Sequence, residues 1–200
     1  MSADSSTETI TLTFEPDNPC NSFISDDSTG EHLYTVVTQH GDETITKLTN
    51  AESGEQLAQW LWKDVRSDVF TLGNTKPQPS SAWLRKSMVP FKDTVHFKDL
   101  NGRNFKWKNC APGLSLELYS DTDKKHPIAV WKKSYRYKDI KSSEQVYDPA
   151  TLTVTGLGLE ILDLVVISFC MLEKNRRINE NGTVSVASSF AIPLVVVAGC

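Results

Sequence analysis

The sequence predicts a mainly β fold of the α+β class, in which a sheet encloses one hydrophobic helix near the C-terminus. The first observation is a series of short runs between residues 9 and 155 in which apolar and polar side chains alternate, as in half-buried strands. The second is the segment 159–174, which contains no Pro or Gly and is apolar nearly all round before a basic end. Such a helix needs apolar neighbours on every side. A chain of 200 residues is long enough for one core of this kind.

Residues 1–30 are predicted to form an acidic, mostly irregular N-terminal arm. The segment is rich in Ser, Thr, Asp and Pro, and residues 1–60 contain eleven acidic side chains and one basic side chain. Within the arm, Ile10, Leu12 and Phe14 alternate with polar residues, which predicts one short strand. The main domain is then expected at 31–177, followed by a C-terminal tail at 178–200.

The next part of the chain combines a clear hairpin with an ambiguous segment. Two β-rich runs flank Gly41-Asp42, a pair that is typical of a hairpin turn. The segment "LAQWLWKDV" that follows fits a helix with Leu57 and Trp60 on one face. It also fits a strand with Ala58 and Trp60 on one side, and the sequence leaves both possibilities open.

The stretch "VHFKDLNGRNFKWKN" predicts a β-hairpin with one apolar face and one basic face. Apolar and polar residues alternate on both sides of Asn101-Gly102. This pair tolerates positive φ at both positions, which predicts a two-residue type I′ turn. Lys106 and Lys108, in the second strand, are expected on the face that points away from the core.

Three further strands are predicted before the helix, at "LSLELYS", "HPIAVWKKSYRYK" and "TLTVTG". The second of these has an aromatic face and a basic face, because its side chains alternate. The aromatic face consists of Trp131, Tyr135 and Tyr137. The basic face consists of Lys132, Arg136 and Lys138.

The helix at 159–174 is predicted to fill the core rather than to cross a membrane. Its apolar part covers about 24 Å at roughly 1.5 Å per residue, short of the roughly 30 Å of a bilayer's hydrocarbon. Glu160 and Asp163 near its start would be costly in lipid, whereas the helix dipole favours them there. The basic cluster of Lys174, Arg176 and Arg177 is expected at the helix end, but it would also suit the flank of a membrane-spanning helix. The membrane alternative therefore stays open.

The tail at 178–200 contains a second apolar stretch, which Pro193 interrupts. This stretch is about ten residues long and too short to span a membrane as a helix. It is either a terminal strand or an exposed, aggregation-prone end.

The charge pattern predicts an anion-binding surface. The net charge of −4 argues against a nucleic-acid-binding protein, but residues 85–141 carry fourteen basic and six acidic side chains. If the basic strands are neighbours, five side chains form a patch that could meet the phosphates of an anionic lipid. The five candidates are Lys106, Lys108, Lys132, Arg136 and Lys138. The alternative is a solvated face that keeps the protein soluble and protects strand edges.

No motif predicts an enzyme, a metal site or a cofactor. The four histidines lack metal-ligand spacing, and no nucleophile-elbow or P-loop motif occurs. "GLGLEI" begins like a dinucleotide fingerprint, but Ile161 stands at its third glycine position. The four cysteines form no CxxC pair, and the N-terminus lacks the pattern of a signal peptide. We therefore expect a non-catalytic, intracellular, cytoplasmic protein.

The order of elements resembles a known family. Many short strands, then "NGRNFKWK", "LELYS" and "IAVWKKS", then an apolar helix ending "LEKNRR", are similar to a fungal domain family of unknown function. That family is grouped with the tubby C-terminal domain, LURP-one-related proteins and phospholipid scramblases. The resemblance covers about residues 33–177. It implies a closed antiparallel β-barrel around a central hydrophobic helix, as in tubby-like domains.

The resemblance also implies a function. Tubby domains bind phosphoinositide headgroups through basic residues on their barrel, so the expected partner is an anionic phospholipid at a membrane surface. The membrane association would be peripheral rather than integral. A protein-interaction or scaffold role is the alternative, as in LURP-one-like domains. A scramblase-like activity is a third possibility, although the cysteine clusters and calcium-responsive segment of scramblase relatives have no recognisable counterpart here.

Overall fold

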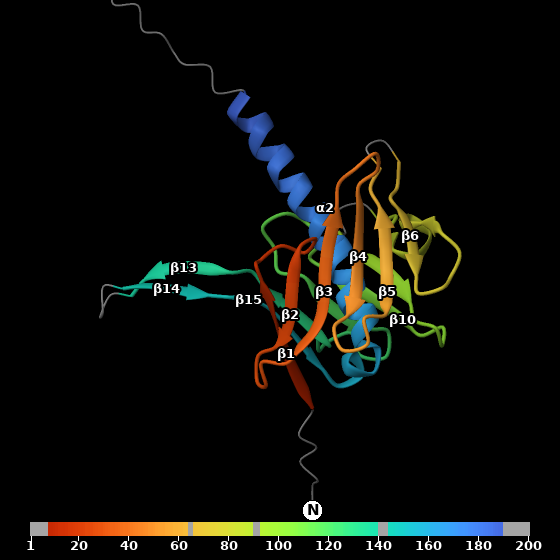
Figure 1. Ribbon diagram of the computed structural model, residues 1–200, viewed down its shortest axis with the longest axis horizontal. Coiled ribbons are helices and arrows are strands. Elements are labelled where there is room, and N and C mark those ends of the chain that lie inside the picture. Colours follow the sequence, from red (N-terminus) through yellow and green to blue (C-terminus); the bar gives the residue numbers. More distant parts are fainter. Residues whose placement is uncertain (1–7, 64–65, 90–92, 140–143, 190–200) are drawn as a thin grey trace, which may run out of the picture.

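The computed structural model describes residues 8–63, 66–89, 93–139 and 144–189, with side chains in the last helix described as far as residue 180. These residues form a mainly β structure with one long helix (Figure 1). The strands are β1 (Thr9–Glu15), β2 (Ser22–Asp26), β3 (His32–Gln39), β4 (Ile45–Asn50), β5 (Gln56–Leu61), β6 (Val69–Leu72), β7 (Gln78–Pro79), β8 (Arg85–Lys86), β9 (Val95–Lys98), β10 (Asn104–Lys108), β11 (Glu117–Ser120), β12 (Ala129–Lys132), β13 (Tyr135–Lys138), β14 (Gln145–Asp148) and β15 (Ala150–Thr155). The helices are α1 (Ser80–Trp83), the 3₁₀ helix η1 (Gly156–Ile161) and α2 (Leu162–Ser189).

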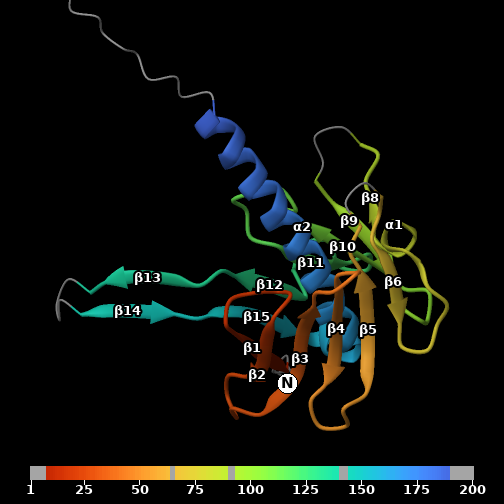
Figure 2. The ribbon, with the colours of Figure 1, turned by 45° about the horizontal axis from the view of Figure 1, so that its top comes forward.

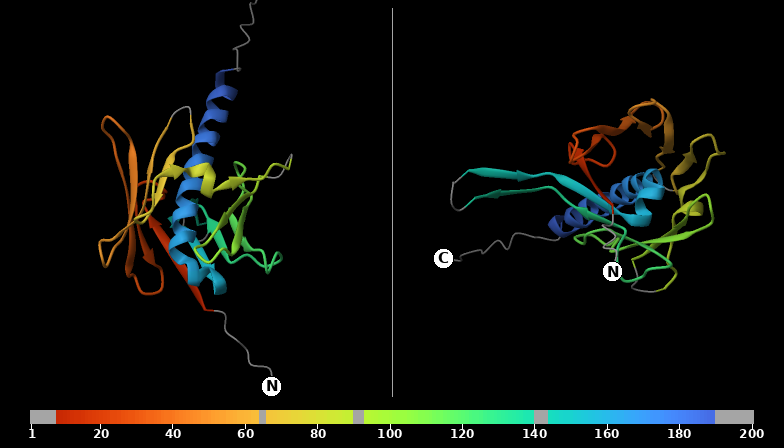
Figure 3. Two further views of the ribbon diagram at one scale, coloured as in Figure 1. Left: turned by 90° about the vertical axis from the view of Figure 1, so that its right-hand side faces the viewer. Right: turned by 90° about the horizontal axis from the view of Figure 1, so that it is seen from below.

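Thirteen of the described strands form one antiparallel sheet, in the order β7-β6-β5-β4-β3-β2-β1-β15-β12-β11-β10-β9-β8. The remaining two, β13 and β14, pair only with each other. The large sheet curls around α2, as the view from below shows (Figure 3). The mainly β class and the enclosed helix are therefore confirmed.

The predicted closed barrel is wrong, because the sheet is open between β7 and β8. Both end strands have only two residues, and the proline that ends β7 has no N–H to donate. The four-residue helix α1 connects them. Its Trp83 stacks on Phe70 of β6, with ring centroids 4.8 Å apart, and lies 5.4 Å from the ring of Phe97 on β9. Side-chain packing therefore links the two ends of the sheet where backbone pairing does not.

The N-terminal segment belongs to the sheet, and the prediction of a mostly irregular arm at 1–30 is wrong for its described residues. Strand β1 contains the predicted "TITLTF" run and pairs with both β2 and β15. Leu12 and Phe14 are fully buried. The alternation of apolar and polar residues was thus a better guide to the secondary structure of this segment than its acidic composition.

The local predictions for the next strands have mixed outcomes. The hairpin at Gly41-Asp42 joins β3 and β4, and the ambiguous segment forms the strand β5, with Ala58 and Trp60 facing inward. The hairpin of β9 and β10 is also confirmed, but its turn is not type I′. Only Gly102 has positive φ there, at 77°. The Asp99 carboxylate accepts hydrogen bonds from the backbone N–H groups of residues 101 and 103, which favours a longer turn.

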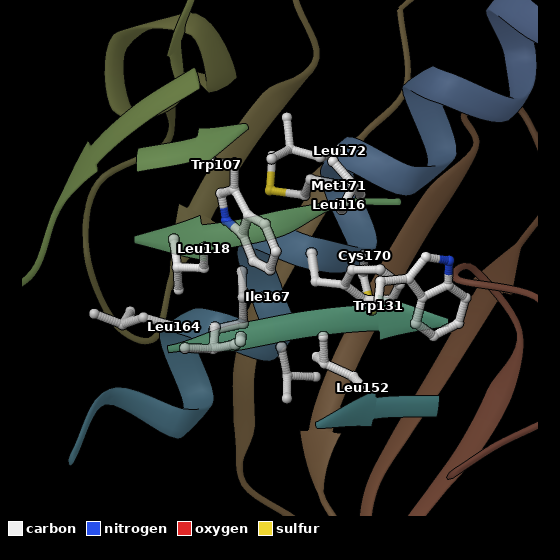
Figure 4. Packing of buried hydrophobic residues seen from close by; sticks show 14 of the residues in the cluster. Trp107, Leu116, Leu118, Trp131, Leu152, Leu164, Ile167, Cys170, Met171 and Leu172 are labelled. Carbon is white, nitrogen blue, oxygen red and sulfur yellow. The ribbon is translucent and has the colours of Figure 1, made fainter. Parts of the chain in front are cut away.

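The first part of α2 fills the core, as predicted. Its residues from Leu164 to Leu172 are all buried, and several of them are seen packed against side chains of the sheet (Figure 4). Phe169 contacts aromatic rings from three strands. Phe169 lies 4.3 Å from Trp131, measured between ring centroids. The one polar residue in this stretch, Ser168, accepts a hydrogen bond of 2.9 Å from the indole N–H of Trp107. Among the described helices, none combines the length and apolar character that crossing a membrane requires.

Gly158 lies where η1 approaches the sheet most closely. A Cβ atom on Gly158 would lie 2.6 Å from the Val154 side chain and 2.7 Å from the carbonyl oxygen of Ile128. In "GLGLEI", Gly158 therefore allows a close approach to the sheet, and Gly156 adopts a positive φ of 50°. These two roles account for both glycines without a dinucleotide.

We expect Gly158→Ala to lower the free energy of unfolding by about 1–3 kcal/mol, because the added methyl overpacks a rigid contact with backbone. Chemical denaturation would measure the change. Gly41→Ala is the matched control, since its Cβ would meet nothing closer than 4.0 Å. Equal stability of the Gly158→Ala variant and the wild type would contradict the close approach.

The basic cluster does not end the helix, because α2 continues to Ser189 and rises out of the sheet (Figure 1). Lys174 and Arg176 are buried instead, at 6% and 4% exposure. The prediction that these charges stand at the helix end is therefore wrong. Part of the predicted tail, 178–189, is helical, and the proposed terminal strand falls largely at 190–200, outside the described residues.

The buried charges of α2 are paired with carboxylates on the same helix and from distant parts of the chain. Glu173 accepts hydrogen bonds from Arg176 at 2.7 and 2.8 Å and from Arg177 at 2.7 Å. Arg177 also pairs with Asp17, and the Lys174 ammonium lies 2.5 Å from Asp68. This cluster ties the helix to the β1–β2 connection and to the start of β6.

Candidate functional site

The five predicted basic residues lie on two structural units. Lys106 and Lys108 are on β10 and Lys132 is on β12, both in the large sheet. Arg136 and Lys138 are on β13, in the separate two-stranded sheet. The prediction of one continuous patch is therefore confirmed only in part.

Strand β11 separates the lysines of β10 from Lys132. The register pairs Lys106 with Tyr119 and Lys108 with Glu117, and Glu117 with Val130 of β12. Paired residues point to the same face, so these side chains and Lys132 share the outer face of the sheet. Strands β10 and β12 are two spacings apart, or about 10 Å. A carboxylate and a tyrosine thus lie between the two groups of lysines.

The lysines of β10 are partly engaged with their neighbours. The Lys108 ammonium lies 3.4 Å from the centre of the Tyr119 ring, a cation–π contact. The Tyr119 hydroxyl in turn donates to Glu117 at 2.8 Å. Burial raises the pKa of Tyr119 to about 12, and its hydrogen bond to Glu117 acts in the same direction. This part of the face is a network of paired groups.

Lys132 marks the base of the β13–β14 ribbon. Its ammonium lies 2.9 Å from the Asp148 carboxylate at the end of β14. Both side chains are well exposed, so water and salt weaken this ion pair and either charge can exchange partners at little cost.

The β13–β14 ribbon projects from the body of the protein as an arm (Figures 1 and 2). All four residues of β13 are exposed. Tyr135 and Tyr137 were predicted on the same face as Trp131, and this prediction is wrong. The chain leaves the large sheet after Lys132, so only Trp131 reaches the core.

Within its described residues, the ribbon carries aromatic side chains on both faces and basic side chains on one face. Tyr135 and Tyr137 stack on one face, with ring centroids 5.9 Å apart. On the other face the Arg136 guanidinium lies 5.2 Å from the centre of the Tyr147 ring, beside Lys138. The three tyrosines are 62%, 42% and 46% exposed. The sequence contained this signal as "YRYK" followed by "VYD", but Tyr135 and Tyr137 were predicted on the face of Trp131 and no prediction was made for Tyr147.

The three cysteines within the described residues show no sign of an activated thiol. Burial raises the pKa of both Cys20 and Cys110 to about 11, so these thiols hold their protons near neutral pH. Burial likewise raises the pKa of Cys170, which lies in the core. Over the described residues, no group of three or more His, Cys, Asp and Glu side chains is placed to hold a metal ion.

The fold and the exposed ribbon define a mainly β protein in which an open antiparallel sheet curls around a helix and presents a basic, tyrosine-rich arm. A family model described as a family of unknown function (DUF6593) matches residues 17–178. The chain belongs to this family. Comparison of this chain with curated proteins and with solved structures found no match in either set. The family match begins at residue 17, earlier than the resemblance over 33–177 predicted. The matched region therefore includes Asp17 and strand β2.

Proposed function

We propose that this protein is a non-catalytic module that binds anionic phospholipid, such as a phosphoinositide, at a membrane surface. The observation that carries the proposal is the exposed β13–β14 ribbon with its tyrosines and basic side chains. Tyrosine favours the boundary between lipid and water, where its ring and hydroxyl are both accommodated. Each Lys or Arg near an anionic membrane surface contributes on the order of 1 kcal/mol.

Three of the five predicted basic residues lie on the ribbon or at its base. Arg136 and Lys138 lie on it and Lys132 lies at its base, whereas Lys106 and Lys108 lie beyond β11. In this proposal the ribbon contacts the membrane first, and the lysines of β10 add long-range attraction. The association is peripheral.

The proposal includes a relationship to tubby C-terminal domains, LURP-one-related proteins and phospholipid scramblases. A central helix enclosed by a curled antiparallel sheet supports that relationship. The open edge between β7 and β8 departs from the closed barrel that the resemblance implies.

We expect charge reversal on the ribbon, Arg136→Glu with Lys138→Glu, to weaken binding to phosphoinositide-containing vesicles at least tenfold. Two favourable charges become two repulsive ones, each worth on the order of 1 kcal/mol. Co-sedimentation over a salt series measures the effect, with neutral vesicles as the baseline. Wild-type binding to the anionic vesicles should fall as salt rises.

The matched control is Lys106→Glu with Lys108→Glu, which makes the same change in net charge away from the ribbon. This control variant should lose less affinity than the ribbon variant. Equal losses of affinity in the two variants would show that binding depends on the net charge of the protein and not on the ribbon. Unchanged binding of the ribbon variant would contradict the ribbon as the lipid-binding element.

A protein partner is the second candidate. Strands β13 and β14 each have one edge unpaired within the described part of the chain, and such edges can pair with a strand of another protein. A wild-type protein that binds neither type of vesicle, while a ribbon variant loses a protein partner, would favour this function over lipid binding.

A further inference from the structure

A pocket of about 510 Å³ lies at the end of the sheet where the chain enters α2. Its walls come from the start of the helix and from three connections, β4–β5, the segment after β6, and β9–β10. The volume is within the range of small-molecule sites, about 300–1,000 Å³. The pocket is separate from the β13–β14 ribbon, because no ribbon residue lines it.

The inner surface of this pocket is apolar and incompletely covered. Ile167 is buried at its base, on the side of α2 that also carries Leu164 (Figure 4). Four leucines on the walls pack against the core but remain partly exposed, which leaves apolar surface for an occupant to cover. They are Leu57, Leu72, Leu159 and Leu162.

The polar groups around the pocket are mostly acidic. Four carboxylates, those of Glu55, Asp99, Glu160 and Asp163, face one guanidinium, that of Arg103, a net charge of −3. Arg103 is already bound to two of the carboxylates, with its Nε 2.6 Å from Asp99 and its Nη1 2.7 Å from Glu160. No cation in the described part of the chain forms an ion pair with the other two, Glu55 and Asp163.

Asp163 is held in place by Tyr34. The tyrosine hydroxyl donates a 2.7 Å hydrogen bond to Oδ1 of Asp163. Burial raises the pKa of Tyr34, and its bond to Asp163 raises it further, so the hydroxyl remains a donor. Oδ2 of the same carboxylate has no hydrogen-bond partner among the described residues and is available to a ligand.

We propose that this pocket binds a single-chain amphiphilic amine. The aliphatic chain would cover the leucine wall, and the ammonium group would bind between Asp163 and Glu55. Charge complementarity selects the cation, because an anionic amphiphile of the same length would meet a net negative rim. This site goes beyond the proposed lipid function, since it lies elsewhere on the protein and selects the opposite charge.

The test is isothermal titration calorimetry of the full chain with decylamine and with decanoate, both below the concentrations at which they form micelles. Decylamine should bind at least tenfold more tightly than decanoate, and its affinity should fall as salt rises. Methyl NMR shifts should appear at Leu57, Leu72 and Leu159. Equal affinities, no binding of decylamine, or shifts confined to other parts of the protein would overturn the proposal.

Two substitutions locate the ammonium group. Asp163→Asn keeps an oxygen that accepts from Tyr34 but removes the charge. Glu55→Gln removes the charge of the other carboxylate, which is exposed. Each should weaken decylamine binding about threefold and the pair about tenfold, as expected for exposed charge pairs. Glu52→Gln, on the same turn but outside the pocket, should leave the affinity unchanged.

The ribbon variant, Arg136→Glu with Lys138→Glu, should also bind decylamine like the wild type. If this variant loses vesicle binding but keeps decylamine binding, the ribbon and the pocket are independent sites. An unchanged affinity in the Asp163→Asn, Glu55→Gln double variant would overturn the amine site while leaving the lipid proposal intact.

Discussion

Glu173→Ala is expected to destabilise the protein by about 3–5 kcal/mol, because it removes the buried carboxylate that Arg176 and Arg177 share and leaves them only Glu180 and Asp17 as partners. Glu173 is fully buried and binds both Arg176 and Arg177. An arginine side chain stays protonated in proteins, so Arg176 cannot relieve the loss by giving up its proton. The penalty is a large part of the roughly 5–15 kcal/mol that stabilises a typical domain. Urea denaturation followed by tryptophan fluorescence would measure it.

The matched control for Glu173→Ala is Glu160→Ala. Glu160 also pairs with an arginine, Arg103, but its side chain is 61% exposed. An exposed pair contributes about 0–1 kcal/mol, since water replaces the lost partner. A loss of stability in Glu173→Ala that is no greater than in Glu160→Ala would contradict the buried cluster at this end of the core.

Val166→Asp is the second substitution with a large expected effect, a loss of several kcal/mol that we expect to prevent cooperative folding. Val166 is fully buried in the part of α2 that the sheet surrounds. A carboxylate there would lose its hydration, and the side chains packed around it are apolar. Circular dichroism during thermal unfolding would report the loss.

Ile178→Asp is the matched control, since it introduces the same charge on the same helix at a residue that is 51% exposed. It should change the stability by about 0.5 kcal/mol or less. Equal melting temperatures for Val166→Asp and the wild type would refute the assignment of α2 as the core helix.

Local sequence patterns predicted the elements whose causes are local. Apolar side chains recur at every second residue in β1, β9 and β10. The turns at Gly41-Asp42 and Gly102 contain residues that favour turn conformations, and Gly102 has a positive φ. The exact turn after β9 was mispredicted because the Asp99 side chain supplies acceptors that a two-residue turn does not need.

The candidate site was predicted less completely than the fold. The basic residues were found because charge is visible in any sequence. The stretch "HPIAVWKKSYRYK" was predicted as one strand, although Lys133 stands on the side of the aromatic residues and interrupts the alternation. The structure divides this stretch into β12 and β13, which exposes the tyrosines and separates Arg136 and Lys138 from the large sheet.

By itself, the sequence determined that a helix apolar on all sides lies inside a curled sheet, because such a helix requires apolar neighbours in every direction. Tertiary structure alone decided that the sheet stays open at α1 and that the charges after the core helix are buried. Those outcomes depend on partners far apart in the chain, such as Asp68 for Lys174 and Asp17 for Arg177. A sequence pattern reflects only residues that are close together in the chain. The free energy of a buried charge depends on the partners that the tertiary structure places beside it.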